Sequence, residues 1–336
     1  MLKLTFPSLA ALLHTFFLEW LGEQRSASSN TVQAYRDAWR LFLRFTAKRR
    51  GKQVAKLHLE DLTEDEVLAF LQHVEQDRHS SITTRNCRLA ALRSFFSFVA
   101  EREPTAARQC HEILRVPFKR APRRSMVYLE ASEVAAIISQ ADPSILEGHR
   151  DHVLLSLLYN TGARIQEALN LRPKDFHLAS PTHVRLLGKG RKERIAPLWP
   201  ETAHLVAAFL KRQPRSSDEH LFVNRYGAAL TASGFRFRLR NYVKAAVATQ
   251  PLLSRKRVTP HTFRHTIAVH LVAAGVDVTI IRSWLGHVHL DTTNLYAEAN
   301  IETQRKALEQ VDPRLRNRKA PRWKRDADLL AWLDSL

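Results

Sequence analysis

The stretch from Thr259 to Ala299 carries the side chains best suited to chemistry. His261 and Arg264 stand three residues apart, so on a helix both project from one face. His287 and Tyr296 follow farther along the same stretch. A phenol close to a guanidinium and imidazoles is an unusual combination for a structural core. It suits nucleophilic attack on a phosphodiester.

The chemistry follows from what a phosphodiester presents. The phosphate carries one negative charge and gains more in the pentavalent transition state, so paired arginines would stabilise that state more than the substrate. Arg264 is one such candidate. The phenol of Tyr296, with an ordinary pKa of about 10, becomes a good nucleophile only beside concentrated positive charge. The phosphotyrosine that results keeps the bond energy, so another strand's hydroxyl can reseal the break without ATP.

Two structural interpretations compete with this one. His261 and His265 stand four apart, as in a zinc site, but neither an HExxH glutamate nor a third ligand at a helpful spacing accompanies them. A tyrosine after a turn, such as Tyr296, is often a packing residue. No pair of carboxylates is placed as in a two-metal nuclease. We therefore expect neither a metal nor a cofactor.

Four motifs resemble the active-site boxes of the tyrosine recombinases, the family of phage integrases and Xer recombinases. They read NTGARIQEALNL, GKGRKER, HTFRH and LGHVHLDTTNLY, and they occur in the family's order within residues 150–300. The resemblance implies catalysis by a set of six residues with Tyr296 as the nucleophile. These are Arg164, Lys189, His261, Arg264, His287 and Tyr296.

Arg164 lies in the first of these motifs, just after Thr161-Gly162 breaks a strongly apolar helix. Its neighbour Glu167 allows two interpretations. The two residues can form a purely structural ion pair, or the carboxylate can orient a phosphate-binding guanidinium. In the family this position is the first phosphate clamp.

Lys189 stands in the best candidate for β structure. Residues 183–187 and 193–198 alternate and flank a glycine-containing turn, which predicts a hairpin. A lysine on such a turn can protonate the departing 5′ oxygen. The resemblance favours Lys189, and Lys192 is the alternative, because the sequence does not fix the register of the turn.

Composition points to a polyanionic partner. The 336 residues include 52 Lys and Arg against 33 Asp and Glu, a formal net charge of +19, and 45% of the residues are hydrophobic, enough for packed cores. Cys87 and Cys110 form neither a disulfide framework nor a metal-binding spacing, which fits a reducing cytoplasm. His14 and Glu19 interrupt the first apolar stretch, so it indicates a core helix and not a signal peptide. No run is long enough to span a membrane.

The spacing of apolar residues predicts that residues 1–114 are helical and that residues 126–312 are mixed and mostly helical. The resemblance implies that the first is a SAM-like core-binding domain and the second the catalytic domain. Ser8 and Thr63 are expected helix caps. Pro117 and Pro122 make residues 115–125 a basic linker. Residues 313–336 form a basic tail, and the resemblance implies that a segment of it docks on a neighbouring protomer. The candidate DNA-binding residues are Arg85, Arg88, Arg120, Arg123, Arg124 and Arg191. A solvated helix face or a plain flexible linker explains the same arginines equally well.

The sequence thus predicts a mainly α protein with the tyrosine recombinase fold, including a small β-hairpin. The expected partners are double-stranded DNA recombination sites, bound as a homotetramer with or without a second recombinase, and no membrane. The expected role is that of a mobile-element integrase or transposase. The alternatives are Xer-type resolution of chromosome or plasmid dimers, a type IB topoisomerase, and a DNA-binding protein without catalysis.

Overall fold

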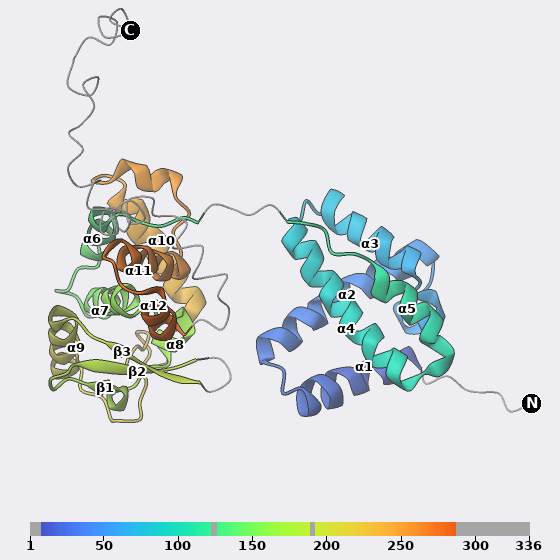
Figure 1. Ribbon diagram of the computed structural model, residues 1–336, viewed down its shortest axis with the longest axis horizontal. Helices are drawn as coiled ribbons and strands as arrows, with labels where there is room; N and C mark the ends of the chain where they lie inside the picture. The colour runs from blue at the N-terminus through green and yellow to red at the C-terminus, as the bar shows by residue number, and fades with distance from the viewer. Residues whose placement is uncertain (1–7, 122–125, 189–191, 287–336) are drawn as a thin grey trace, which may run out of the picture. The chain divides into compact units, whose positions relative to one another are not determined.

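The computed structural model describes residues 8–121, 126–188 and 192–286. Within these ranges the chain is mainly helical with one small antiparallel sheet, as the sequence predicts (Figure 1). It divides into two compact units, residues 1–124 and 125–336. Each unit has a hydrophobic core of its own. The described helices include none that combines the length and the apolar character needed to cross a bilayer.

The first unit is built from helices. Helix α1 (Leu9–Thr15) continues directly as a π-helix, η1 (Phe16–Gln24). The longer helices are α2 (Ser29–Arg50), α3 (Glu64–Gln76), α4 (Ile82–Arg102) and α5 (Ala107–Arg115). Short 3-10 turns cover Val54–Lys56, Leu59–Asp61 and Pro104–Ala106.

Hydroxyl side chains begin four of these helices. Ser8, Ser28, Thr63 and Ser81 each accept a hydrogen bond from the backbone N–H three residues later, which satisfies one of the free donors of the first turn. The expected caps at Ser8 and Thr63 are confirmed. Helix α2 begins at Ser29, because Ser28 provides the cap.

Helix α4 lies at the centre of the first unit and packs against α2, α3 and α5. It buries Phe95 completely, with its ring 4.5 Å from Trp39 and 5.3 Å from Phe16, centroid to centroid. These edge-to-face contacts bring aromatic side chains from α2, η1 and α4 together. Aromatic side chains of these three elements therefore form much of the core of the first unit.

Residues 116–121 form neither helix nor strand and are bound along α4. Asn86 donates a hydrogen bond to the carbonyl of Lys119 (2.7 Å) and accepts one from its N–H (3.2 Å). Arg85 donates to the carbonyl of Pro117 (2.9 Å) and forms an ion pair with Glu75 (3.3 Å). This part of the predicted linker is thus held by side chains of the first unit.

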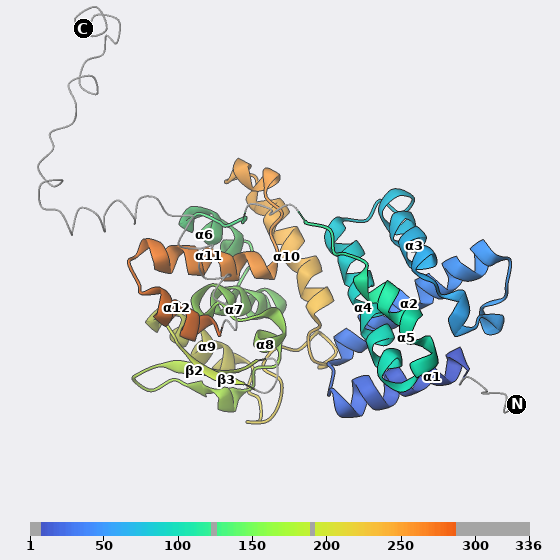
Figure 2. The same ribbon diagram turned by 45° about the vertical axis from the view of Figure 1, so that its right-hand side comes forward.

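The second unit combines helices with the sheet. Its helices are α6 (Ala131–Ser139), α7 (Leu146–Thr161), α8 (Ile165–Leu169), α9 (Pro200–Arg212), α10 (Ala232–Ala246), α11 (Pro260–Ala273) and α12 (Val278–Leu285). Two 3-10 turns cover Pro173–Asp175 and Pro251–Arg255. The apolar helix α7 packs against α6, α9 and α11, and Figure 2 shows it lying between α11 and the sheet.

The sheet has three antiparallel strands in the order β1 (Phe176–His177), β2 (His183–Leu187) and β3 (Glu193–Pro197). The predicted pairing of β2 with β3 is confirmed, whereas β1 was not anticipated. Val184 lies opposite Ala196 and Leu186 opposite Arg194. The three apolar members of these pairs are completely buried. Arg194 therefore projects from the inward face of β3.

Candidate active site

Arg164 occupies the N-cap position of α8, where the chain turns after α7. Gly162 ends α7 with φ +59°, and a Cβ there would lie 2.4 Å from a methyl carbon of Leu285, so only glycine fits. Glu167, one turn into α8, accepts hydrogen bonds from the Arg164 N–H (2.9 Å) and from its guanidinium (2.7 Å). The carboxylate thus fixes both the backbone and the side chain of Arg164.

Glu167 also accepts a hydrogen bond from a second arginine, Arg194, to which the sequence assigned no role. The guanidinium of Arg194 donates to Glu167 (2.8 Å) and to the carbonyl of Trp284 (2.9 Å). Burial alone would raise the pKa of the Glu167 carboxyl, but hydrogen bonds and charge from Arg194, together with hydrogen bonds from Arg164, hold the pKa below its ordinary value. Glu167 is therefore an anion with a guanidinium at each oxygen.

Arg264 and His261 come from α11, as their spacing predicts. Arg264 is 3% exposed. It donates to the carbonyl of Gly162 (2.7 Å) and to the carbonyl of Leu285 (2.5 Å). These bonds tie α11 to the turn that carries Arg164 and to the end of α12. The structure thus brings two of the predicted catalytic arginines to the same turn.

His261 lies close enough to Arg264 and Arg164 for their charges to lower the pKa of its ring. One side of the residue is open to solvent, yet the atoms packed around its ring lower its pKa below 6.5, and the charges of Arg264, Arg164 and Arg236 lower the pKa further. The imidazole is therefore neutral at pH 7. Burial, followed by the charges of His261 and Arg264, lowers the pKa of His265 to about 4.

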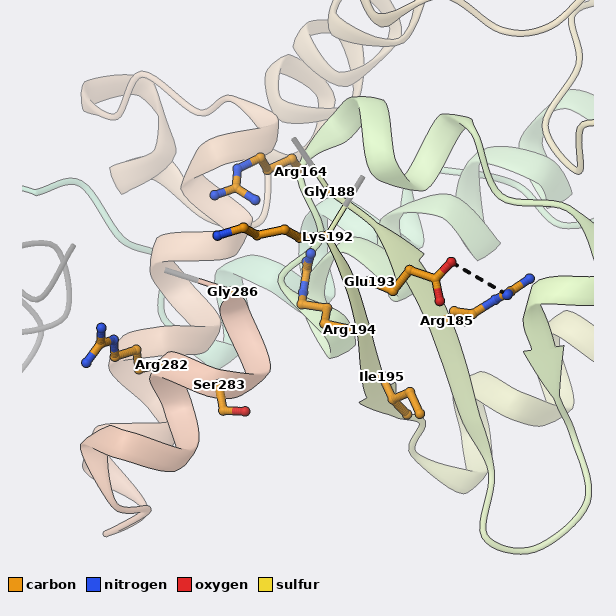
Figure 3. A pocket seen from close by; sticks show the side chains of 10 residues that line it. All are labelled: Arg164, Arg185, Gly188, Lys192, Glu193, Arg194, Ile195, Arg282, Ser283 and Gly286. Carbon is orange, nitrogen blue, oxygen red and sulfur yellow. Dashed lines mark ion pairs between the residues drawn. The ribbon is translucent and has the colours of Figure 1, made fainter. Parts of the chain in front are cut away.

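A cavity of about 810 Å³ opens beside these groups. Its polar lining is dominated by Arg164, Arg185, Lys192, Arg194 and Arg282, with Glu193 as the carboxylate among the lining residues. Figure 3 shows the side chains of Arg164 and Lys192 reaching toward the same side of this cavity. The positive charges of Arg164 and Lys192 suit a phosphate group with its developing negative charge, whereas Arg185 is paired with Asp175 and Glu193.

Several predicted residues lie outside the described part of the chain. They are Lys189, His287 and Tyr296 of the catalytic set, and Arg123, Arg124 and Arg191 of the DNA-binding set. Lys192, the alternative general acid, is exposed at the cavity. Among the described residues, no three or more His, Cys, Asp or Glu side chains gather as metal ligands would.

The remaining candidate DNA-binding residues differ in their surroundings. Arg120 is exposed, and Arg88 is partly exposed while donating to the carbonyl of Ala34 (3.2 Å). Arg85, by contrast, is 4% exposed and is engaged by Glu75 and by a backbone carbonyl. We therefore leave Arg85 out of the DNA interface proposed below.

Two features of the site were missed at the sequence level. Helix α12 supplies the carbonyls of Trp284 and Leu285 and the partly exposed positive charge of Arg282, yet it was not predicted. Arg194 was placed on a strand and given no role. The strand alternation that buries Ala196 also turns Arg194 inward, and an arginine at an inward position signals a buried anionic partner.

Comparison with known proteins decides the family. Residues 127–303 match the phage integrase family, and residues 15–103 match the phage integrase N-terminal SAM-like domain. The chain belongs to the phage integrase family of tyrosine recombinases. A Sinorhizobium fredii protein named as an integrase/recombinase, y4rC, is 37% identical to this tyrosine recombinase over 98% of each chain. Tyrosine recombinase XerC of Roseiflexus castenholzii is 33% identical over 85% of this chain and 88% of its own.

Solved structures show the same fold. The XerH site-specific recombinase bound to palindromic difH substrate has a TM-score of 0.64 with 22% identity, covering 85% of this chain and 81% of its own. The Tn1549 transposon integrase in complex with transposon right end DNA has a TM-score of 0.64 with 18% identity, covering 88% of this chain and 98% of its own. The predicted fold, a mostly helical tyrosine recombinase with a SAM-like N-terminal domain, is confirmed.

Proposed function

We propose that this tyrosine recombinase cuts one DNA strand per active site through a 3′-phosphotyrosyl bond to Tyr296 and exchanges strands by way of a Holliday junction. The observation that carries the proposal is the convergence of Arg164 and Arg264 on one turn, where His261 senses the charge of both. Fixed guanidinium groups stabilise charge on a reacting phosphate without reorganising during the reaction.

In the first step the Tyr296 oxygen forms a bond to phosphorus, and the bond from phosphorus to the 5′ oxygen breaks. Arg164 and Arg264 bind the non-bridging oxygens, which carry the added charge of the transition state. Because His261 is neutral, its ring can accept the phenol proton or donate a hydrogen bond to the phosphate. Lys189 donates the proton that the 5′ oxygen requires, with Lys192 as the alternative donor.

Resealing is the reverse reaction with a different strand. A 5′ hydroxyl attacks the phosphotyrosine, the bond to Tyr296 breaks, and the proton returns to the phenol. Because the phosphodiester energy is kept in the protein–DNA bond, the exchange needs no ATP. The residues assigned to these steps bring no metal or cofactor into the scheme.

Binding of DNA in this proposal rests on charge and on the relatives. The net charge of +19 favours a polyanion, and the solved structures of XerH and the Tn1549 integrase contain DNA. We assign phosphate contacts to the partly exposed Arg88 and the exposed Arg120, and from sequence alone to Arg123, Arg124 and Arg191. The active species is a homotetramer on paired sites, with or without a second recombinase.

The proposed domain boundaries remain those expected from sequence. They are a core-binding domain over residues 1–114, a linker over 115–125, a catalytic domain over 126–312 and a docking tail over 313–336. The two compact units support the division between binding and catalytic parts. The similarity to an integrase/recombinase over 98% of the chain favours a mobile-element role. The similarity to XerC favours dimer resolution as the second candidate.

Paired and single sites test this function. DNA flanking the gene should be searched for inverted repeats, and each repeat placed once or twice in a supercoiled plasmid. The recombinase should form an SDS-resistant adduct at the 3′ end of the cut and yield recombinant circles only from the two-site plasmid. Relaxation of a plasmid that lacks the sites would identify a topoisomerase, and specific binding without any adduct would identify a non-catalytic protein.

A further inference from the structure

The C-terminal end of α12 is capped by two arginines from different elements. Arg194 of β3 donates to the carbonyl of Trp284, and Arg264 of α11 donates to the carbonyl of Leu285. The last carbonyls of a helix have no partner within the helix and carry its partial negative charge, so guanidinium groups stabilise them. The position of α12 is therefore set jointly by β3 and α11.

Arg194 faces a second acceptor as well. The Nε–H of Arg194 donates to the carbonyl of Trp284, and one of its terminal nitrogens donates to the Glu167 carboxylate. The other oxygen of that carboxylate accepts a hydrogen bond from the guanidinium of Arg164. A planar guanidinium with donors at fixed angles can hold two acceptors at once in a way that a lysine ammonium cannot. The side chain of Arg194 is 10% exposed, so both bonds are shielded from water.

These contacts form one continuous path between the two proposed phosphate clamps. The path runs from Arg164 through Glu167 and Arg194 to the end of α12, and from there through the Leu285 carbonyl to Arg264. We propose that Arg194 is a positioning residue that fixes the spacing of Arg164 and Arg264. The proposal rests on the function above, in which these two arginines bind the scissile phosphate.

Arg185 provides a matched control in the same cavity. It lies on the neighbouring strand β2 and lines the cavity with Arg194 (Figure 3). Its side chain is 46% exposed and pairs with Asp175 (3.1 Å) and Glu193 (3.7 Å). Arg185→Met therefore removes the same charge from the same cavity without touching the path between the clamps.

The test compares two suicide substrates, one with an ordinary scissile phosphodiester and one with a methylphosphonate there. The methyl group removes the negative charge that the clamp neutralises, so a displaced clamp matters less. Arg194→Met should cleave the phosphodiester about 100-fold more slowly, the cost of a small misplacement of catalytic groups. Its methylphosphonate cleavage should stay near that of the parent. Arg194→Lys should resemble Arg194→Met, and Arg185→Met should resemble the parent.

Two outcomes overturn the proposal. Equal losses on both substrates would mean that Arg194 only supports folding, and parental phosphodiester cleavage by Arg194→Lys would mean that charge alone matters. If Arg194→Met fails to bind DNA, Arg194→Lys carries the comparison alone. Tyr296→Phe in the same gels keeps the two hypotheses apart, because an adduct that persists there refutes the proposed nucleophile and not the role of Arg194.

Discussion

Replacing Glu167 with glutamine should loosen the active site while conserving the shape of the side chain. Glu167 accepts two hydrogen bonds from Arg164 (2.7 and 2.9 Å) and one from Arg194 (2.8 Å), and its side chain is 5% exposed. A glutamine keeps one carbonyl oxygen but turns an NH₂ group toward one guanidinium. That donor-to-donor contact leaves a buried cation without its anion.

The expected cost follows from these contacts. Losing one charge-assisted hydrogen bond costs about 1.5–3 kcal/mol, and breaking a buried ion pair about 3–5 kcal/mol. Because glutamine keeps part of the contact, we expect Glu167→Gln to lower the free energy of unfolding by about 3 kcal/mol. Cleavage should slow by about 100-fold, because Arg164 loses the group that orients it.

Urea titration and single-turnover cleavage of a suicide substrate measure the two effects. The pKa of Glu167 lies below 4.5 in the folded protein, so its contribution is fully present above pH 4.5 and lost as the pH falls through the folded pKa. The stability gap between parent and variant should therefore be constant from neutral pH down to about pH 5 and close in more acidic solution.

Glu193→Gln is the matched control for Glu167→Gln. Glu193 lines the same cavity, but its side chain is 57% exposed and its contact with Arg185 is 3.7 Å long. Exposed pairs of this kind contribute at most about 1 kcal/mol. Equal losses of stability in Glu167→Gln and Glu193→Gln would refute the reasoning that burial and the double arginine contact make Glu167 different.

Three further predictions concern other described and proposed groups. Because the pKa of His265 is about 4, the unfolded chain binds a proton between pH 6.5 and 4 that the folded chain does not. The free energy of unfolding should fall by up to about 3 kcal/mol as the pH falls through this window. In urea titrations His265→Phe should weaken this dependence on pH, and an unchanged dependence would contradict a buried, neutral His265. Lys189→Ala should slow cleavage of a normal substrate but spare a 5′-thiolate leaving group, while Lys192→Ala should leave both rates unchanged; the reverse pattern assigns the general acid to Lys192. Arg120→Ala should reduce the slope of log K for DNA binding against log salt by about 0.9, measured by fluorescence anisotropy. Arg85→Ala should instead destabilise the first unit. A stable Arg85→Ala protein with a reduced salt slope would contradict the structural role given to Arg85.

Local signals in the sequence account for much of the fold. The caps Ser8 and Thr63, the three-residue spacing of His261 and Arg264, and the alternation on either side of Lys189 each depend on neighbours within one turn or one hairpin. Such patterns are set by backbone geometry and by which face is apolar. They predict elements well without specifying which elements touch.

The missed features depend on contacts between distant segments. Arg85 stands four residues before buried Leu89, so its place on the apolar face of α4 could have been read from the helical period. Its partner, the carbonyl of Pro117, is 32 residues away and has no local signal. Arg194 reaches the carbonyl of Trp284, 90 residues along the chain, and helix α12 itself is only eight residues long.

Covalent capture by Tyr296 is the central claim, and a nicked suicide substrate tests it most directly. The parent protein should become joined to the 3′ phosphate of the cut strand, and peptide mapping should place the DNA on Tyr296. Tyr296→Phe should bind the same DNA with unchanged affinity and form no adduct. An adduct of equal yield from Tyr296→Phe, or one mapped to another residue, would contradict the account.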